Sequence, residues 1–136
     1  MKVFIFIPIL ILIPFIIFSQ EEDGFYSVQY TTNKLVFIKT DGTIKEIGSL
    51  GQSIGQKYFG LAFDKKGQLW LFHARKLFKI DHLTGKAELY KILKYSYDST
   101  QGFFGDIAFD EQNRMFIYME IPSNPEGSLG IVDTNT

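Results

Sequence analysis

The sequence predicts an all-β protein, on three observations. From Gly24 onward, short runs rich in Phe, Tyr, Ile, Leu and Val alternate with turns of Gly, Asp, Asn and Thr. No window has the i, i+3, i+4 apolar spacing with caps that a helix requires. A pattern of four short strands also recurs along the chain. Strands packed through their apolar side chains are therefore expected to form the whole fold.

The first residues have the composition of an export signal. A basic start at Lys2 precedes an apolar run over residues 3–18, and Ser19 is the small residue that signal peptidase prefers before its cut. The run is interrupted by two prolines and is shorter than the roughly 20 residues needed to span a bilayer, so a retained anchor is the weaker alternative. We expect a signal peptide over 1–19 and a mature domain over 20–136, without stable membrane insertion, that is secreted, periplasmic or at the cell surface.

Charge and cysteine content exclude several classes of protein. Lys and Arg number 14 and Asp and Glu 15, which leaves no basic excess for a nucleic-acid partner. The chain has no cysteine, so disulfides, thiolate catalysis and cysteine metal sites are excluded. The fold must therefore be held by the packing of its apolar residues.

Residues 58–92 predict one complete group of four antiparallel strands. Asp64 can hydrogen bond to the backbone two residues on, and Gly67 can take a positive φ, so this pair closes the first hairpin. Asp81 and Gly85 do the same between the third and fourth strands. The expected strands are Tyr58–Phe63, Gln68–His73, Lys76–Ile80 and Lys86–Ile92.

Partial copies of this group lie on either side of it. Residues 59–64 recur as residues 104–110 with one insertion, and 69–72 match 115–118 at an offset of 46. A period of about 40 to 50 residues with four short strands is typical of β-propeller blades. The sequence predicts about two and a half blades of an incomplete propeller, which needs missing blades or a second chain to close. The flanking strands are expected at 25–30, 34–39, 43–47, 105–109, 114–121 and 128–132.

These residues carry a family resemblance. Ala-Phe-Asp, followed by a Gly or Asn turn and an aromatic strand, resembles NHL, gluconolactonase and related six-bladed propellers over residues 24–136. The segment 80–86 is similar to the Asp-x-x-Thr-Gly turn of quinoprotein repeats and secreted repeat proteins. The gluconolactonase resemblance implies acidic and Asn metal ligands from several blades around a central channel. Asp106, at a strand start, is the position here that fits, whereas Leu61 stands at the nearest place in the preceding blade.

The loops at one rim of the disc form the predicted binding surface. Connections from the fourth strand of one blade to the first strand of the next, and from second to third strands, line the mouth of a propeller channel and vary freely. Residues 95–101 form such a loop, rich in Tyr, Ser and Thr, which suits polar recognition of proteins or sugars, and 122–127 are a neighbouring insertion. An ordinary solvated loop is the alternative. The expected ligand-binding residues are Tyr95, Tyr97, Asp98, Asp106 and Asn124.

No catalytic or metal constellation is predicted. His73 and His82 lack a second imidazole at ligand spacing, so we expect structural roles for both. A triad of Ser96 or Ser99 with His73 and Asp106 lacks a Gly-x-Ser-x-Gly nucleophile elbow. The sequence therefore predicts no resident cofactor and no metal. It favours a noncatalytic secreted module that binds a protein or glycan, with part of a secreted metal-dependent lactonase or hydrolase as the alternative.

The core is expected between blades. Strands stacked face to face bury both surfaces of a blade, so polar alternation is lost, as residues 69–72 show. Trp70 and its aromatic neighbours are accordingly expected to pack in the core instead of forming a ligand platform. The residues expected to be buried are Leu61, Phe63, Leu69, Leu71, Phe78, Ile80, Ile107, Phe109, Ile117 and Val132.

Overall fold

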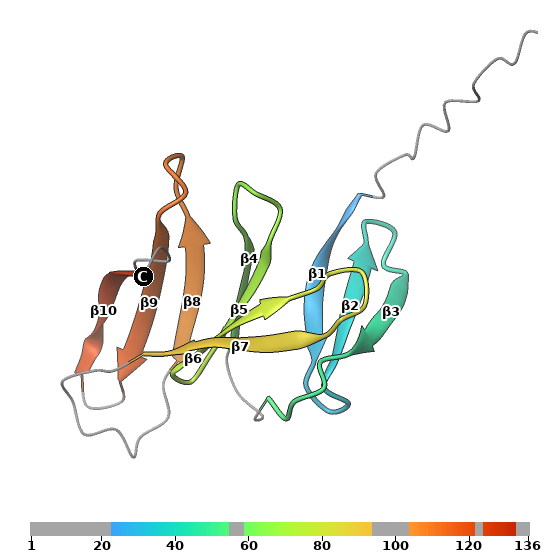
Figure 1. The fold of residues 1–136 in the computed structure, drawn as a ribbon, viewed down its shortest axis with the longest axis horizontal. Helices are drawn as coiled ribbons and strands as arrows, with labels where there is room; N and C mark the ends of the chain where they lie inside the picture. Colours follow the sequence, from blue (N-terminus) through green and yellow to red (C-terminus); the bar gives the residue numbers. More distant parts are fainter. Residues whose placement is uncertain (1–22, 55–58, 94–103, 122–123, 133–136) are drawn as a thin grey trace, which may run out of the picture.

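The part of the protein that the structure describes forms three antiparallel sheets (Figure 1). A computed structural model describes residues 23–54, 59–93, 104–121 and 124–132. Every regular element within these ranges is a strand. No helix that could cross a membrane occurs among the described residues. The strands are β1 (Gly24–Gln29), β2 (Lys34–Lys39), β3 (Ile44–Ser49), β4 (Phe59–Phe63), β5 (Leu69–His73), β6 (Lys76–Ile80), β7 (Ala87–Ile92), β8 (Phe104–Phe109), β9 (Met115–Ile121) and β10 (Asn124–Val132).

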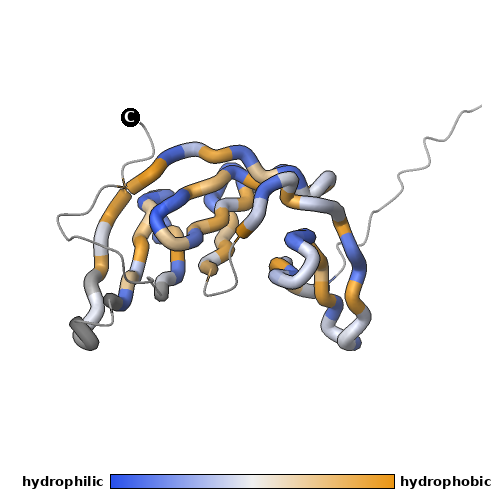
Figure 2. The backbone as a smooth tube through the Cα atoms, turned by 90° about the horizontal axis from the view of Figure 1, so that it is seen from below, coloured by the Kyte–Doolittle hydropathy of each residue, from blue (hydrophilic) through white to orange (hydrophobic). Residues whose placement is uncertain are grey.

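Each sheet contains strands that follow one another in the chain. We call β1-β2-β3 blade 1, β4-β5-β6-β7 blade 2 and β8-β9-β10 blade 3. The backbone tube seen from below follows an arc through the three blades (Figure 2). The predicted class, all-β with blades of antiparallel strands, is confirmed. Blade 2 shares one core cluster with blade 1 and another with blade 3, so loops from adjacent blades meet at the two rims of the arc.

Strand β10 differs from the expected loop. The insertion at 122–127 was expected to be loop, but Asn124 already belongs to β10 and pairs with Ile121. A register shift separates this pair from the next one, Ser128 with Met119. A β-bulge takes up extra residues while the strand continues to pair, which is why the insertion does not end the ladder.

The first hairpin turn of a blade is held by aspartate. The Asp64 carboxylate accepts backbone hydrogen bonds at 2.8 and 2.9 Å from the turn that follows it, and Gly67 has φ 79°. The Asp110 carboxylate does the same in blade 3 at 3.0 and 2.8 Å, with Asn113 at φ 63° in place of glycine. Both aspartates are turn formers, as predicted. Gly67 and Asn113 complete the turns, because Gly and Asn tolerate the left-handed conformation that this position needs. The equivalent Asp133 lies outside the described residues.

The turn between β6 and β7 uses a third aspartate. Asp81 accepts hydrogen bonds from the Thr84 hydroxyl and from the Leu83 backbone N–H, and these bonds hold the pKa of Asp81 below its ordinary value. Gly85 follows with φ 82°, as expected. A Cβ on Gly85 would lie 2.6 Å from the Gly48 carbonyl oxygen, so glycine also allows blade 2 to approach blade 1 here.

Blade 2 is buried on both faces. The four consecutive residues of β5 from Leu69 to Phe72 are exposed by 4% or less. Leu69 and Leu71 belong to one core cluster, shared with blade 1. Trp70 and Phe72 belong to the other, shared with blade 3. Alternate β5 side chains thus serve different interfaces, which confirms the core position of Trp70 and explains the apolar run in the sequence.

The expected core is correct except at one strand end. Leu61, Phe109 and Val132 are half-buried and pack against the two clusters. Phe63 is 42% exposed, so its predicted burial is wrong. It ends β4 at the rim, where its ring meets Tyr26 and His82 edge-on at 5.5 and 5.6 Å instead of lying beneath a neighbouring blade. The other expected residues are buried: Leu69, Leu71, Phe78, Ile80, Ile107 and Ile117.

Candidate functional site

The predicted binding residues are only partly within the described structure. Tyr95, Tyr97 and Asp98 lie outside it. Asp106 lies near the start of β8, and its exposed carboxylate accepts the backbone N–H of Ile107 at 2.8 Å. Asn124 lies on β10, on the other side of β9. The structure therefore does not bring Asp106 and Asn124 together on adjacent strands.

Asp106 lies at a close approach of blades 2 and 3. A Cβ on Gly60 of β4 would lie 2.6 Å from the Asp106 carboxylate and 2.6 Å from the Ile107 backbone nitrogen. Only glycine allows this contact between the first strands of the two blades. In the ranges that the structure describes, no group of three or more His, Cys, Asp or Glu side chains could hold a metal ion.

A polar hollow lies at the opposite rim. The turns β4–β5 and β8–β9 lie together there, because antiparallel strands alternate in direction. A hollow of about 570 Å³ separates them. It is lined by Asp64, Lys66, Gln68, Trp70, Lys79, Gln112 and Asn113.

A second hollow, of about 580 Å³, continues from the first. The two share Gln68 and Lys79, and we call them together the rim groove. The groove extends across the end of blade 2 and draws on three turns. Its remaining lining residues are Gln52, Ile80, Asp81, Lys86, Ala87 and Glu88.

Asp64 fixes one wall of the rim groove. While one carboxylate oxygen holds the turn, the other accepts the indole N–H of Trp70 at 3.1 Å. Trp70 is 4% exposed, so it forms part of the groove wall and does not offer an open surface for stacking. With both oxygens engaged, Asp64 anchors the turn and the indole together.

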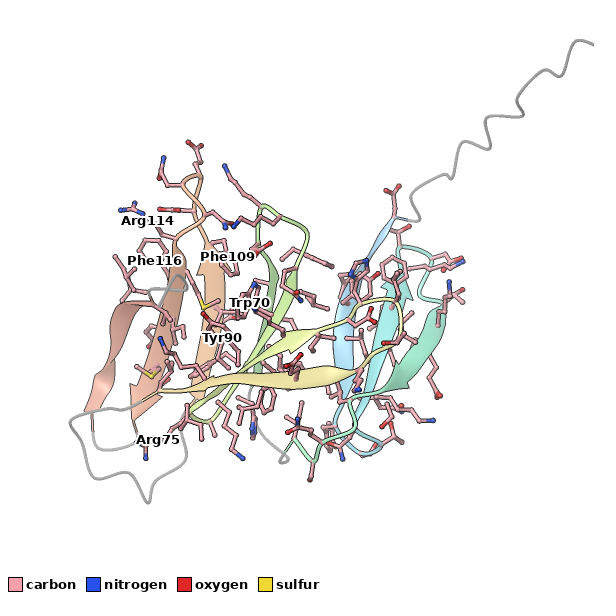
Figure 3. All side chains as sticks on the ribbon, in the orientation of Figure 1. Trp70, Arg75, Tyr90, Phe109, Arg114 and Phe116 are labelled. Carbon is pink, nitrogen blue, oxygen red and sulfur yellow. The ribbon has the colours of Figure 1, made fainter. Side chains whose placement is uncertain are left out.

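Lys79 is held over aromatic rings. It stands directly opposite Trp70 in the register of β5 and β6. Its ammonium nitrogen lies 4.5 Å from the Tyr90 ring centroid and 5.3 Å from that of Trp70. Cation–π attraction restricts the side chain to the groove, while its N–H groups remain donors. Figure 3 shows Trp70, Tyr90 and Phe109 gathered between blades 2 and 3.

The amides of the groove are oriented by the backbone. Gln68 donates from Nε2 to the carbonyl oxygens of Leu69 and Ile80, both at 2.9 Å. This orientation leaves the Gln68 amide oxygen as an acceptor for a ligand. Asn113 accepts the backbone N–H of Lys65 at 2.6 Å, which joins the β4–β5 turn to the β8–β9 turn. Both walls of the groove are thus tied together before any ligand enters.

The charges of the groove balance. Its cations are Lys66, Lys79 and Lys86, and its anions are Asp64, Asp81 and Glu88. A balanced set of fixed donors and acceptors suits a neutral ligand rich in hydroxyl or amide groups, because a polyanion would need a net positive surface. None of these residues was predicted as a site residue, since they are far apart in sequence and meet only through the packing of blades.

Comparisons with known proteins give a likeness of fold. No family model and no curated protein matches the chain. A catalytically inactive virginiamycin B lyase from Staphylococcus aureus, solved with quinupristin, has a TM-score of 0.48 and 17% identity over 82% of this chain and 38% of that one. A streptogramin B lyase has a TM-score of 0.46 and 18% identity, over 87% and 39% of the two chains. The chain thus spans about two fifths of the length of these enzymes, and no residue role is carried over from them.

Proposed function

We propose that this chain is a secreted, noncatalytic propeller-type module that binds a glycan at the rim groove, on the rim opposite the loops expected from the sequence. The observation that supports the proposal is the rim groove, where three turns bring oriented amides, balanced charges and a held ammonium group onto one concave surface. Sugar hydroxyls both donate and accept, so they can pair with Gln68 Oε1, with Lys79 and with open side chains such as Lys66 and Gln112. The apolar run that predicts an export signal over residues 1–19 supports the extracellular setting.

A glycan array followed by titration calorimetry tests this proposal. The double variant Lys66→Ala/Gln112→Ala removes two groove side chains. Both residues hold their turns through backbone N–H groups, which alanine keeps, so the fold should be kept. Affinity is expected to fall about tenfold, or about 1.4 kcal/mol. The control Lys45→Ala removes an exposed cation on β3, outside the groove, and should bind normally.

Three results would count against this assignment. Binding that is unchanged in the groove variant would place the site elsewhere. Equal loss in Lys45→Ala would indicate a nonspecific charge effect. Absence of array binding, together with specific capture of a protein partner that the groove variant no longer captures, would replace the glycan by a protein ligand at the same groove.

A metal-dependent lactonase or hydrolase is the second candidate function. Asp106 favours it, because this exposed carboxylate sits where the first strands of blades 2 and 3 meet. Thermal melting with and without calcium separates the two candidates. Strong stabilisation by calcium that is lost in Asp106→Asn would favour the enzyme, whereas an unchanged melting temperature would favour the binding module.

A further inference from the structure

The two end blades of the arc each carry an exposed apolar face. On blade 3 the side chains that point away from blade 2 include Leu129, 70% exposed, and Ile131, 61% exposed. On blade 1 the side chains that point away from blade 2 include Phe25, 60% exposed, and Ile44, 64% exposed. Contiguous exposed apolar groups of this kind mark interaction surfaces.

The blade 3 outer face comprises the apolar residues Ala108, Phe116, Tyr118, Leu129 and Ile131, with Asp106 opposite Tyr118 at its β8 edge. The register aligns Phe116 with Ile131 and Tyr118 with Leu129 across β9 and β10. Figure 3 places Phe116, with Arg114 beside it, on the side of blade 3 away from Trp70. The Arg114 guanidinium lies 5.6 Å from the Phe116 ring centroid, so this ring is partly covered while its neighbours are open.

Blade 2 shows what such a face does when it is covered. The rows Trp70 with Lys79, and Phe72 with Leu77, occupy the same strand positions in blade 2 as the two rows of the blade 3 outer face. There Trp70, Phe72 and Leu77 are exposed by 4%, 1% and 0%. They pack against Ile107, Met115 and Ile117 of the following blade. The blade 3 outer face is therefore one half of a blade interface.

The blade 1 outer face has the character of the other half. Phe25, Ile38 and Ile44 form one row across β1, β2 and β3. The corresponding row of blade 2, made of Leu69, Ile80 and Ala87, is buried against blade 1. Blade 1 thus offers to a preceding blade one apolar row like that of blade 2, beside a second row of Ser27, Val36 and Glu46.

We propose that the blade 3 outer face of one molecule binds the blade 1 outer face of a second copy of this chain. The two faces are different, so the contact is head-to-tail, and it continues the blade order already present within the molecule. Both faces are rich in large apolar side chains, and Tyr118 and Phe25 supply the aromatic groups that are enriched at interfaces. Assembly then either closes into a ring or grows with concentration.

Light scattering after size exclusion and sedimentation velocity test the assembly on the mature chain that begins at Gln20, because the apolar run over residues 3–18 would itself promote association. This chain is expected to run as a dimer or larger species at micromolar concentration. Leu129→Glu/Ile131→Lys on one face and Phe25→Glu/Ile44→Lys on the other should each shift the mass to that of a monomer. Leu83→Glu is the control, because Leu83 is 77% exposed in a turn and belongs to neither face. It should assemble normally.

Mixing the two face variants tests the head-to-tail geometry. Each variant keeps one intact face, and these faces are complementary, so an equimolar mixture should form a 1:1 dimer although neither variant associates alone. A monomeric wild-type chain would overturn the proposal, and so would face variants that remain as large as wild type. A mixture that stays monomeric would exclude the head-to-tail contact.

A cross-link measures the same contact without disturbing it. The chain has no cysteine, so Leu129→Cys in one molecule and Ile44→Cys in another can form a disulfide only with each other or with their own kind. The mixed product is expected to predominate over either homodimer. Equal yields with Leu83→Cys as the partner would show random collision and would contradict the proposed contact.

Discussion

Side chains of the same residue type in this protein differ widely in burial, according to whether a neighbouring blade covers them. Phe72 and Phe63 belong to the same blade, yet Phe72 is 1% exposed between blades 2 and 3, whereas Phe63 is 42% exposed at the rim. The contrast shows that burial here depends on the neighbouring blade and not on residue type. Phe63, at the end of β4, lacks the cover that Phe72 receives in mid-strand.

Phe72→Ala is expected to be far more destabilising than Phe63→Ala. Loss of a fully buried ring leaves a cavity and costs about 3 to 5 kcal/mol. Loss of the Phe63 edge contacts with Tyr26 and His82 costs about 1 kcal/mol. Urea unfolding of both variants, compared at equal m-value, measures the difference. Equal free energies of unfolding for the two variants would show that the Phe72 site is not packed as described.

The turns between strands depend on ionised aspartates. Desolvation tends to raise the pKa of Asp110, but hydrogen bonds from the Arg114 backbone and guanidinium, together with its charge, lower it overall. Hydrogen bonds from Thr84 and Leu83 lower the pKa of Asp81. A lowered pKa in the folded state means that the charged form contributes to the stability of each hairpin.

The melting temperature is expected to fall in acid through these turns. The contribution of Asp81 is fully present above the ordinary aspartate value of 3.8 and is lost as the pH falls through the lower pKa of the folded state. Asp81→Asn should therefore melt below wild type at pH 7, and the gap should narrow toward pH 2. Calorimetry across this range measures it, with Glu111→Gln as an exposed control. If the difference in melting temperature between wild type and Asp81→Asn widened in acid, the ionised Asp81 carboxylate would not be the source of the stability.

The N-terminal segment lies outside the described residues, and its role is predicted from the sequence alone. Its apolar run over residues 3–18 predicts removal on export, with cleavage after Ser19. Mass spectrometry of the exported protein should find a chain that begins at Gln20. Recovery of a soluble exported product that still carries residues 1–19 would rule out cleavage at this position.

Local chemistry determined what could be predicted at the scale of elements. The two hairpins could be predicted from Asp64 with Gly67 and from Asp110 with Asn113, because the hydrogen bonds and the positive φ of each turn lie within a few residues. The bulge before Ser128 was missed because it depends on pairing with β9. The predicted strands otherwise match the observed ones to within about two residues at each end.

The site was harder to predict because it belongs to the whole molecule. Asp64 and Asn113 are far apart in the chain and share a hollow only because two blades pack side by side. A usable signal was present within blade 2, since the two-residue connection between β5 and β6 sets Trp70 opposite Lys79. The facing turn from blade 3 could not be placed without the packing of one sheet on another.

The sharing of β5 between two separate cores has a consequence for motion. A fluctuation that opens blade 1 disturbs the cluster of Leu69 and Leu71, and one that opens blade 3 disturbs the cluster of Trp70 and Phe72. Only the opening of blade 2 must break both at once, so it is the rarest event. The β5 amides should consequently be the last in the chain to exchange with deuterium, and the terminal blades should fray around a persistent middle sheet.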